Sequence, residues 1–488
     1  MLPEQQKNML LAITVSLVIV VGFNIIFPPP QPEEMGQDQK ELEQKTPVDK
    51  LKEKNAFDAD GKLRNRTVTA DAGPKLGADT KDMIRQPPPR NLRPIFKDRA
   101  SVLQDDINRV KISSTRLTGS IALTGARIDD LVLKGYRSSL DPNSEEIILL
   151  QPQGSEKPYY AEFGWLGNAV EVPNSKSVWK ADRSVLSPGK PVTLSWDNGK
   201  GLKFERVISL DNSYMFQITQ RVRNSTNQAI SLAPYGLVSR TGTPEVLGFY
   251  ILHEGMIGVL NGVLQEVDYD DFDDGRPKRF ESKGGWLGIT DKYWLAALIP
   301  NQKQTANTSF VSHKRGSQQA YQADYLSPSM SVNPGETIEA KSNFFAGAKE
   351  KKLLDSYMVD LKVDKFDLAI DFGWFWFFTK PFFSALSYFN EMFGNYGVAI
   401  LILTVIIKII FFPLANKSYR AMSKMKALQP KMEELKERFG EDRQRMNTEL
   451  MNLYKTEKVN PAAGCFPILI QIPVFFALYK VLFVSIEM

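Results

Sequence analysis

Three apolar segments, each close to the length of a membrane span, most constrain the fold of this 488-residue chain. Residues 9–27 carry no charged side chain, and residues 465–479 continue their apolar character to residue 486. Residues 396–414 are interrupted only by Lys408. A helix needs about twenty apolar residues to cross a bilayer. The sequence therefore predicts three transmembrane helices, at 9–27, 396–414 and 465–486.

The first apolar segment follows the short polar start MLPEQQK, and a cleaved signal peptide is one interpretation of it. The segment is longer than a usual signal-peptide core of about 7 to 15 residues, and the following NIIFPPPQP offers no small-x-small cleavage site. We therefore interpret residues 9–27 as an uncleaved signal anchor, preceded by a cytoplasmic N-terminus at residues 1–8.

The charge distribution predicts the orientation of the spans. The chain has a formal net charge of +5, and its excess of basic residues lies beside the last two spans, chiefly in the loop 415–460. Loops rich in Lys and Arg stay on the cytoplasmic side of the membrane. The long segment between the first two spans is then exported, and Met488 lies on the exported side.

Composition argues against disulfides, metals and familiar catalytic motifs. Cys465 is the single cysteine, and His253 and His313 are isolated in the sequence. No P-loop, no GxGxxG after a strand and no GxSxG occurs. We expect no catalytic residue, no metal and no cofactor, and an exported domain held together by its core alone.

The exported segment changes texture along its length. Residues 28–104 are rich in Pro, Gln and charged residues, which predicts a disordered linker. Residues 105–348 contain short alternating runs such as GLKFERVISL and MFQITQRVRN, which predict many antiparallel strands in one sandwich or barrel. Residues 349–373 predict a helical connector, because the run AKEKKLLDSYMVDL, which begins at residue 348, has the composition of a helix.

An acidic stretch in this domain, VDYDDFDDG, has a calcium-binding interpretation. Asp270, Asp274, Gly275 and Glu281 stand at EF-hand offsets, but Phe272 occupies a position that should supply an oxygen ligand. No helical pattern flanks the stretch. We therefore favour a solvated acidic loop.

An aromatic helix is predicted at residues 374–394, before the second span. Aromatic and leucine side chains recur there at spacings of three and four residues, at positions Phe382, Phe383, Leu386, Phe389 and Phe393. Trp374 and Trp376 precede them. Such a helix suits the headgroup boundary of a membrane, and the alternative is a helix that faces the core of the exported domain.

The loop 415–460 predicts a helical hairpin. One apolar stripe runs from Met425 to Phe439 and a second from Met446 to Leu453, with Gly440 and Asp442 between them as stop and start signals. Pro430 is expected to bend the first helix, because it removes a backbone donor.

Lys408 has two interpretations. Its stem could snorkel toward the cytoplasmic end of the span, about 9 Å away at 1.5 Å per residue. Alternatively, Lys408 faces a hydrated groove, since intramembrane cations usually serve a function. Thr404 lies one turn away on the same face, and Gln471 is the polar residue at comparable depth in the last span. These positions favour the groove.

The C-terminal motifs resemble the YidC family of membrane protein insertases. The most specific is KVNPAAGCFPILIQIPVFFALYK, and DFGWFWFFTKPFF, GNYGVAILILTVIIKIIFFPL and AMSKMKALQPKMEELKERFG follow the family's order. The resemblance implies a multi-domain membrane protein. It would combine an all-β supersandwich in the periplasm, related in fold to carbohydrate-active proteins, with an α-helical transmembrane bundle and a cytoplasmic helical hairpin.

The resemblance also implies a site. Lys408, Thr404 and Gln471 match positions that line a hydrophilic groove, although many relatives have arginine where this chain has Lys408. The third span would contact the substrate, through Pro467, Ile472, Pro473 and Phe475. The family has further C-terminal spans beyond the third, and we expect autonomous insertion to need them.

The implied function is non-enzymatic insertion of hydrophobic segments of nascent proteins into the bacterial inner membrane, alone or with the secretion channel. Nascent membrane proteins, the secretion channel, the ribosome on the basic hairpin and anionic lipid are the implied partners, without a nucleotide. Two alternatives stay open: a membrane-anchored periplasmic module that binds a carbohydrate-like ligand, and an accessory partner of the secretion channel.

Overall fold

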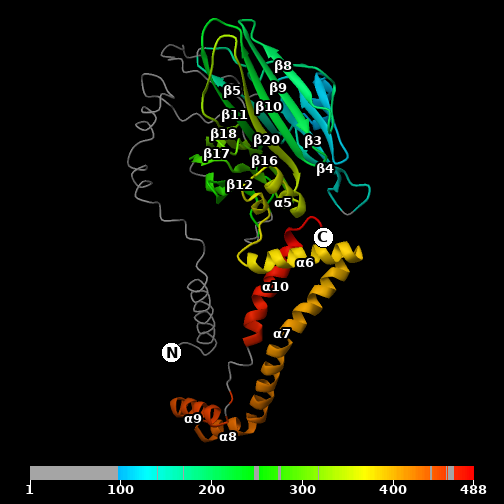
Figure 1. Cartoon of the computed structure of the whole chain (residues 1–488). Helices are drawn as coiled ribbons and strands as arrows, with labels where there is room; N and C mark the ends of the chain where they lie inside the picture. Colours follow the sequence, from blue (N-terminus) through cyan, green and yellow to red (C-terminus); the bar gives the residue numbers. More distant parts are fainter. Residues whose placement is uncertain are drawn as a thin grey trace, which may run out of the picture. The chain divides into compact units, whose positions relative to one another are not determined.

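The computed structural model describes residues 97–139, 141–168, 170–246, 252–272, 276–316, 318–439, 442–457, 459 and 466–488. Within these residues a β domain comes first, and a group of long helices follows it (Figure 1). The predicted signal anchor and the predicted linker up to residue 96 lie outside the described residues, as does Cys465.

The last residues of the predicted linker are ordered. Helix α4 (Arg99–Asp105) begins at the N-cap Asp98, whose carboxylate accepts a 2.9 Å hydrogen bond from the Ser101 N–H. Arg99 also binds the buried carboxylate of Asp130 on the β domain. The prediction of a disordered linker is therefore wrong for residues 99–104, because local capping and one long-range ion pair hold them.

The strands of the β domain form two sheets. The first sheet contains β1 (Arg109–Ser113), β2 (Leu117–Ala122), β3 (Arg127–Arg137), β4 (Glu146–Leu150), β5 (Tyr159–Gly167), β7 (Val185–Leu186), β11 (Ile230–Thr241), β14 (Lys278–Lys283), β17 (Thr305–Arg315), β18 (Gln318–Leu326) and β19 (Met330–Val332). The second contains β6 (Lys180–Ala181), β8 (Val192–Asp197), β9 (Leu202–Leu210), β10 (Met215–Asn224), β12 (Gly255–Leu260), β13 (Val263–Asp268), β15 (Trp286–Thr290), β16 (Trp294–Ile299) and β20 (Thr337–Ala348). Neighbouring strands pair antiparallel in both sheets, apart from the short parallel pair of β1 and β7.

The two sheets face each other across an apolar core. Phe163 on β5 and Phe344 on β20 meet edge to face with ring centroids 6.1 Å apart, and both rings are buried. Arg206 on β9 crosses the same interface, where its guanidinium donates a 2.7 Å hydrogen bond to the Ala126 carbonyl. Strand β9 alternates buried and partly exposed residues, as the period of two predicts. The fold class predicted from the sequence, a β sandwich followed by membrane-type helices, is confirmed.

The acidic stretch that suggested calcium forms the 3₁₀ helix η1 (Tyr269–Phe272) at the end of β13. Phe272 is buried, and its ring lies against that of Tyr321 with centroids 6.1 Å apart. Asp274 and Gly275 lie outside the described residues. Over the ranges that the structure describes, no group of His, Cys, Asp and Glu has the arrangement of a metal site.

A connector leaves the sandwich and packs back onto it. It consists of helix α5 (Lys351–Asp360), the 3₁₀ helix η2 (Phe366–Ala369) and the extended residues that follow. The Phe366 ring is fully buried and meets Trp286 and Phe345 edge to face, with centroids 5.2 and 5.4 Å away. Residues 361–372 are therefore a strap that belongs to the core of the β domain.

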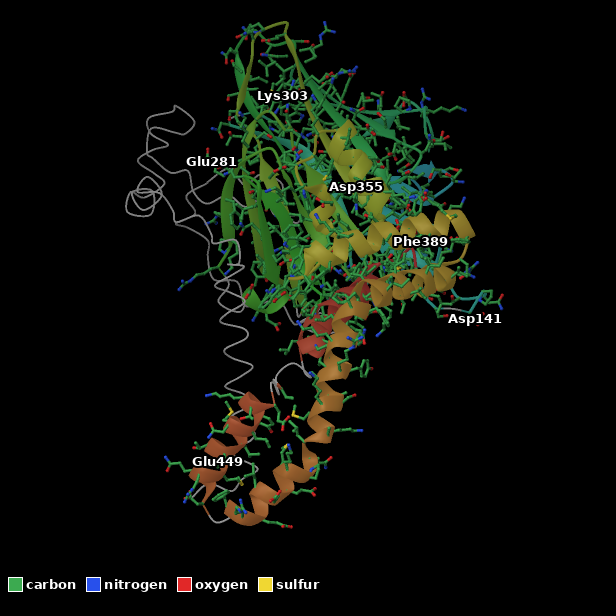
Figure 2. All side chains as sticks on the ribbon, turned by 60° about the horizontal axis from the view of Figure 1, so that its bottom comes forward. Asp141, Glu281, Lys303, Asp355, Phe389 and Glu449 are labelled. Atoms are coloured by element: carbon green, nitrogen blue, oxygen red, sulfur yellow. The ribbon has the colours of Figure 1, made fainter. Side chains whose placement is uncertain are left out.

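In the described part of the chain, five helices follow the strap: α6 (Trp376–Phe393), α7 (Tyr396–Ala427), α8 (Gln429–Phe439), α9 (Arg443–Thr456) and α10 (Phe466–Val484). Figure 2 marks Phe389 on α6 and Glu449 on α9. Gly394 ends α6 in the left-handed conformation, and Asn395 caps α7 by accepting a hydrogen bond from the Val398 N–H. A tight corner of two residues thus joins α6 to α7.

Helix α7 continues well past the predicted span, which ended at residue 414, and Pro413 lies inside it. The hairpin helices α8 and α9 are antiparallel, as the ion pair between Lys431 and Glu457 indicates. The predicted first hairpin segment is interrupted at Leu428, two residues before Pro430, in agreement with the expected bend. Pro430 lies in the first turn of α8, where its missing N–H has no helical acceptor to satisfy.

Candidate functional site in the membrane helices

Helices α7 and α10 are long and apolar enough to cross a membrane. Most of the apolar side chains along them are exposed, among them Leu401, Val405, Ile409, Ile410 and Phe412 on α7 and Ile468, Ile472, Phe475, Phe476 and Tyr479 on α10. Contiguous apolar surface of this extent is rare on proteins that face only water. These faces are suited to contact with lipid or with another apolar segment.

Lys408 lies in the middle of the exposed apolar surface of α7. Its side chain is exposed, Val405 and Ile409 beside it are exposed as well, and Thr404 one turn earlier is half-buried. Among the described residues, no hydrogen bond or ion pair to the Lys408 ammonium is found. The cation is therefore available to a group that approaches α7 from outside.

The other predicted site residues lie on α10. Gln471, Ile472 and Phe475 are exposed, and Pro467 and Pro473 are half-buried. Helices α7 and α10 contact each other. The described residues contain no hydrogen bond between Lys408 and Gln471, so the groove that would join these side chains stays a prediction.

The aromatic helix α6 presents two different faces. Phe383 and Leu386 are buried and belong to the same apolar core as Ala399 and Leu403 of α7. Trp374 and Trp376, at the start of the helix, are 82% and 58% exposed. One face of α6 therefore packs against the protein, and its tryptophans point outward, where a membrane interface would suit them.

Sequence reasoning missed a second lysine in the last span. Lys480 of α10 is only 8% exposed, and its Nζ lies 2.7 Å from Oδ2 of Asp371, which ends the strap. Two signals pointed to this pair. Lys480 is the only charged residue in the apolar run of α10, and Asp371 stands just before the aromatic helix.

Further charged groups lie near this ion pair in the β domain. Lys349 is fully buried at the end of β20, where burial lowers the pKa of its ammonium to about 8 and its Nζ donates a 3.0 Å hydrogen bond to Thr290 Oγ1. Burial also raises the pKa of the Glu266 carboxyl on β13. The charges of Asp371 and Lys480 act on both groups. The end of the last span is therefore electrostatically coupled to the β domain.

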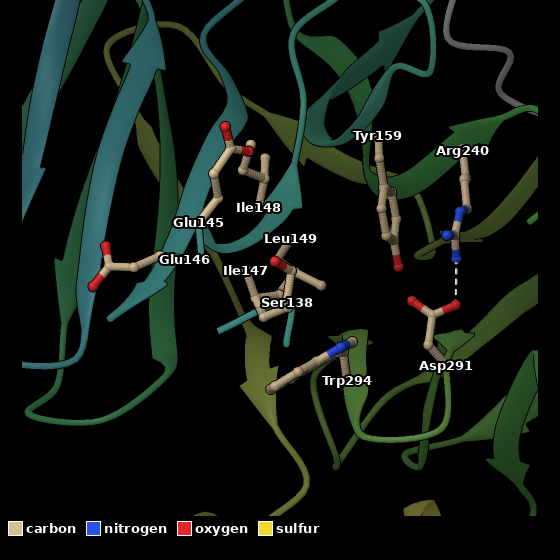
Figure 3. A pocket seen from close by; sticks show the side chains of 10 residues that line it. All are labelled: Ser138, Glu145, Glu146, Ile147, Ile148, Leu149, Tyr159, Arg240, Asp291 and Trp294. Carbon is tan, nitrogen blue, oxygen red and sulfur yellow. Dashed lines mark hydrogen bonds and ion pairs between the residues drawn. The ribbon is translucent and has the colours of Figure 1, made fainter. Parts of the chain in front are cut away.

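A cavity of about 340 Å³ opens elsewhere in the β domain (Figure 3). Trp294 and Tyr159 supply aromatic surface, and the Arg240 guanidinium binds the Asp291 carboxylate at 2.6 Å. Arg240 also stacks over the Tyr159 ring, 5.0 Å from its centroid. Arg240 and Asp291 are thus engaged with each other, and the carboxylates of Glu145 and Glu146 also line the cavity.

Comparisons with known proteins agree with this arrangement. Residues 109–385 match the family model of the YidC periplasmic domain, and residues 388–488 match that of the 60Kd inner membrane protein. The chain is 45% identical over 502 residues to the membrane protein insertase YidC of Methylobacterium sp. (strain 4-46), with 99% of this chain and 78% of that protein covered. It is 50% identical over 391 residues to that of Methylobacterium nodulans, with 78% and 65% covered.

The chain thus spans about two thirds to three quarters of the length of these relatives. Among solved structures, it is similar to a galactose mutarotase related enzyme from Lactobacillus acidophilus, at 11% identity and a TM-score of 0.34, over 49% of this chain and 97% of that one. The two family models and the identity to the relatives confirm the resemblance carried by the C-terminal motifs, and the chain belongs to the YidC family of membrane protein insertases.

Proposed function

We propose that this protein inserts hydrophobic segments of nascent proteins into the bacterial inner membrane. The observation that carries the proposal is the state of Lys408. Within the described part of the chain its ammonium has no ion-pair partner, whereas Lys480, the other lysine in an apolar span, is paired with Asp371. A lysine at mid-span costs about 2.5 to 3.5 kcal/mol on insertion scales, so an uncompensated one is retained for a function.

The function that fits an exposed intramembrane cation is reception of an acidic group. In this proposal the acidic flank of a substrate enters a partly hydrated groove lined by Lys408, Thr404 and Gln471. The attraction to Lys408 lowers the cost of bringing a carboxylate to that depth. The membrane potential then adds about 2.3 kcal/mol per acidic charge for each 100 mV as the flank moves to the positive, exported side.

The apolar part of the substrate would move along the last span. Phe475 is 63% exposed and Ile472 is exposed beside it, so the outer face of α10 offers a smooth apolar surface, with Pro467 and Pro473 at its edge. The free-energy gain comes from transferring the substrate's apolar surface out of water. This transfer needs no nucleotide and no cofactor.

The proposed topology puts the hairpin in the cytoplasm and the β domain in the periplasm, in a multi-pass protein of the inner membrane. Helices α8 and α9 carry exposed basic residues that suit the ribosome or anionic lipid on the cytoplasmic side, among them Lys431, Lys436 and Arg445. We further propose that the protein acts alone on some substrates and with the secretion channel on others.

The cavity of the β domain gives weaker support to a second function, the binding of a carbohydrate-like ligand. A carbohydrate-binding module would need free polar groups beside the aromatic surface of Trp294 and Tyr159. Arg240 and Asp291 instead pair with each other, which leaves Glu145 and Glu146 as the other charged groups of the cavity. An accessory role beside the secretion channel is a third alternative, and it predicts no effect of Lys408 on substrates that insert without the channel.

The proposal is tested with the full-length form of this chain, by insertion of a small single-span protein with an acidic exported tail in cells depleted of their own insertase. We expect Lys408→Arg to support translocation of the tail, measured by protease accessibility, and Lys408→Ala to lose it. Lys417→Ala is the matched control, because Lys417 is exposed on the same helix beyond the apolar segment. Equal activity of Lys408→Ala and the parent protein would refute the role of the cation.

A further inference from the structure

The apolar residues of helix α10 are distributed around its whole circumference. Its sequence, FPILIQIPVFFALYKVLFV, is hydrophobic on every side of the helix. Burial of apolar surface is non-directional, so it does not select which side of such a helix packs against the protein. Some other interaction must fix the rotation of α10 about its axis.

The helix nevertheless has one defined rotation in the structure. Val474, Ala477, Val481 and Val484 are buried, at the spacings of three and four residues that mark one helix face. The opposite face, which includes Ile472, Phe475 and Tyr479, is exposed. Both faces are apolar, so hydrophobicity alone does not distinguish them, although the exposed face carries the larger side chains.

Lys480 breaks this degeneracy because it lies on the buried side. Its Nζ reaches Oδ2 of Asp371 at 2.7 Å, and the two side chains are 10% and 24% exposed. A rotation of α10 by half a turn would carry the ammonium away from Asp371 and leave both charges without their partner. Both changes are costly for groups removed from water.

Asp371 has a contact that holds it independently of Lys480. Its other oxygen, Oδ1, accepts a 2.8 Å hydrogen bond from the Gly373 N–H. Gly373 has a φ of +67°, and a Cβ at that position would lie 3.3 Å from Lys480 Cε. Glycine thus provides both the turn and the space for the lysine stem.

The strap anchors Asp371 to the β domain. Ile370 and Phe372 on either side of it are buried, and Phe366 lies in the aromatic core. A second contact holds the same end of α10, where the Lys292 ammonium lies 3.7 Å from the centre of the Phe483 ring. The acceptor of the ion pair is therefore a fixed point of the β domain.

We infer that Asp371 is a positioning residue that fixes the rotation of α10 through Lys480, and so selects the face that α10 presents to the substrate. This inference rests on the proposed function only in taking the exposed face of α10 as the one that meets the substrate. An α-helix turns about 100° per residue, so Lys480 and Gln471, nine residues apart, point in opposite directions. Holding Lys480 inward thereby holds Gln471 outward, with Phe475 close to it. Buried polar pairs set helix register in coiled coils by the same physics.

The test measures which face of α10 meets lipid, without any substrate. A diazirine side chain of leucine size replaces either Val474, which is buried, or its neighbour Phe475, which is exposed. The whole chain is irradiated in vesicles of phosphatidylethanolamine and phosphatidylglycerol, and lipid adducts at the two positions are compared by mass spectrometry. We expect adducts to be concentrated at position 475 in the parent protein.

Three variants then decide the outcome. Asp371→Asn and Lys480→Met should lose the selectivity and label both positions alike, and the charge swap Asp371→Lys/Lys480→Asp should restore it. Lys480→Met keeps an apolar stem and leaves no cation without a partner in α10, so it guards against simple misfolding. The matched control is Asp367→Asn/Lys380→Met, which removes the 2.6 Å ion pair between the strap and α6 and should leave the selectivity unchanged.

Unchanged labelling in both Asp371→Asn and Lys480→Met would overturn the inference, as would a charge swap that fails to restore selectivity. Insertion of the acidic-tailed substrate is measured on the same proteins. If the parent protein labels selectively but inserts nothing, the proposed function fails and the rotation of α10 by Asp371 stands. If the parent inserts and Asp371→Asn and Lys480→Met both keep its selectivity, the inference fails alone.

Discussion

Arg127 Nε donates a hydrogen bond to Glu162 Oε2 over 2.8 Å in the interior of the β domain, and each of the two side chains is only 6% exposed. The pair joins the adjacent strands β3 and β5, and Tyr235 Oη donates a 2.9 Å hydrogen bond to the other carboxylate oxygen. Removing one partner would leave a buried charge without compensation.

Glu162→Leu should therefore lower the free energy of unfolding by about 3 to 5 kcal/mol, the usual cost of breaking a buried ion pair. Urea unfolding of the detergent-solubilised chain, followed by tryptophan fluorescence, measures the change. The double variant Arg127→Met/Glu162→Leu should regain most of the loss. Equal stability of the single and double variants would contradict this account.

Asp324 makes the stability of the β domain depend on pH. Burial raises the pKa of its carboxyl to about 7, although Ser309 and Gln322 each donate a 2.8 Å hydrogen bond to it. Between the unfolded pKa of 3.8 and pH 7, the folded protein keeps a proton that the unfolded chain releases. The contribution of this group to stability is therefore complete below pH 3.8 and is lost as the pH rises through 7.

Asp324→Asn should remove this contribution, so that the variant equals the parent near pH 4 and exceeds it near pH 8 by on the order of 2 to 4 kcal/mol. Unfolding of both proteins across the pH range measures the difference. Asp141→Asn, at an exposed position, is the control and should leave the profile unchanged. A constant difference between Asp324→Asn and the parent at all pH values would rule out titration of this group.

Phe366 should be the most costly residue of the strap to truncate. Its fully buried ring touches Trp286, Phe345 and Tyr357. Phe366→Ala leaves a cavity in this aromatic core and should cost about 3 to 5 kcal/mol. Phe377→Ala, on the exposed side of α6, should cost far less in the same unfolding experiment. Similar losses in the two variants would mean that the strap is not part of the core.

Trp374 and Trp376 test the membrane boundary. If these exposed rings lie among the headgroups, lipids brominated near the headgroup should quench them more strongly than lipids brominated at the chain ends. Trp374→Phe/Trp376→Phe should remove most of the shallow quenching. Trp286→Phe, which removes a fully buried ring, should not. Stronger quenching by the deep label would place α6 inside the hydrocarbon instead.

Trp294 separates insertion from ligand binding in the β domain. It lines the cavity and packs edge to face on Tyr136 at 5.2 Å. Trp294→Ala should leave insertion of the acidic-tailed substrate unchanged, because the cavity plays no part in the proposed mechanism. A loss of insertion in a variant that still folds would favour the binding-module alternative.

The sequence predicted individual strands better than it predicted which strands pair with each other. Alternation alone identified strands such as β9, because one of its faces is buried. It did not identify the pairing of β5 with β11, about seventy residues later in the chain, because both strands are buried along most of their length. Strands with little alternation carry little information about their neighbours.

The candidate site was predictable only in part, for a similar reason. Lys408 stands out because apolar residues flank it on both sides. Lys480 has the same surroundings, but its meaning depends on Asp371, which lies 109 residues earlier in the sequence. The order of α4 was missed because it depends on a local cap and on a long-range ion pair.

The length of helix α7 has a consequence for the position of the hairpin. Its 32 residues extend for about 48 Å at 1.5 Å per residue, against a hydrocarbon thickness of about 30 Å. The portion of α7 that exceeds this thickness therefore carries the hairpin. Pro413 lies five residues after Lys408 and removes the backbone bond to the Ile409 carbonyl, which makes this point the natural pivot. A bend at this point would change the direction of the hairpin without moving the half of the helix that bears Lys408.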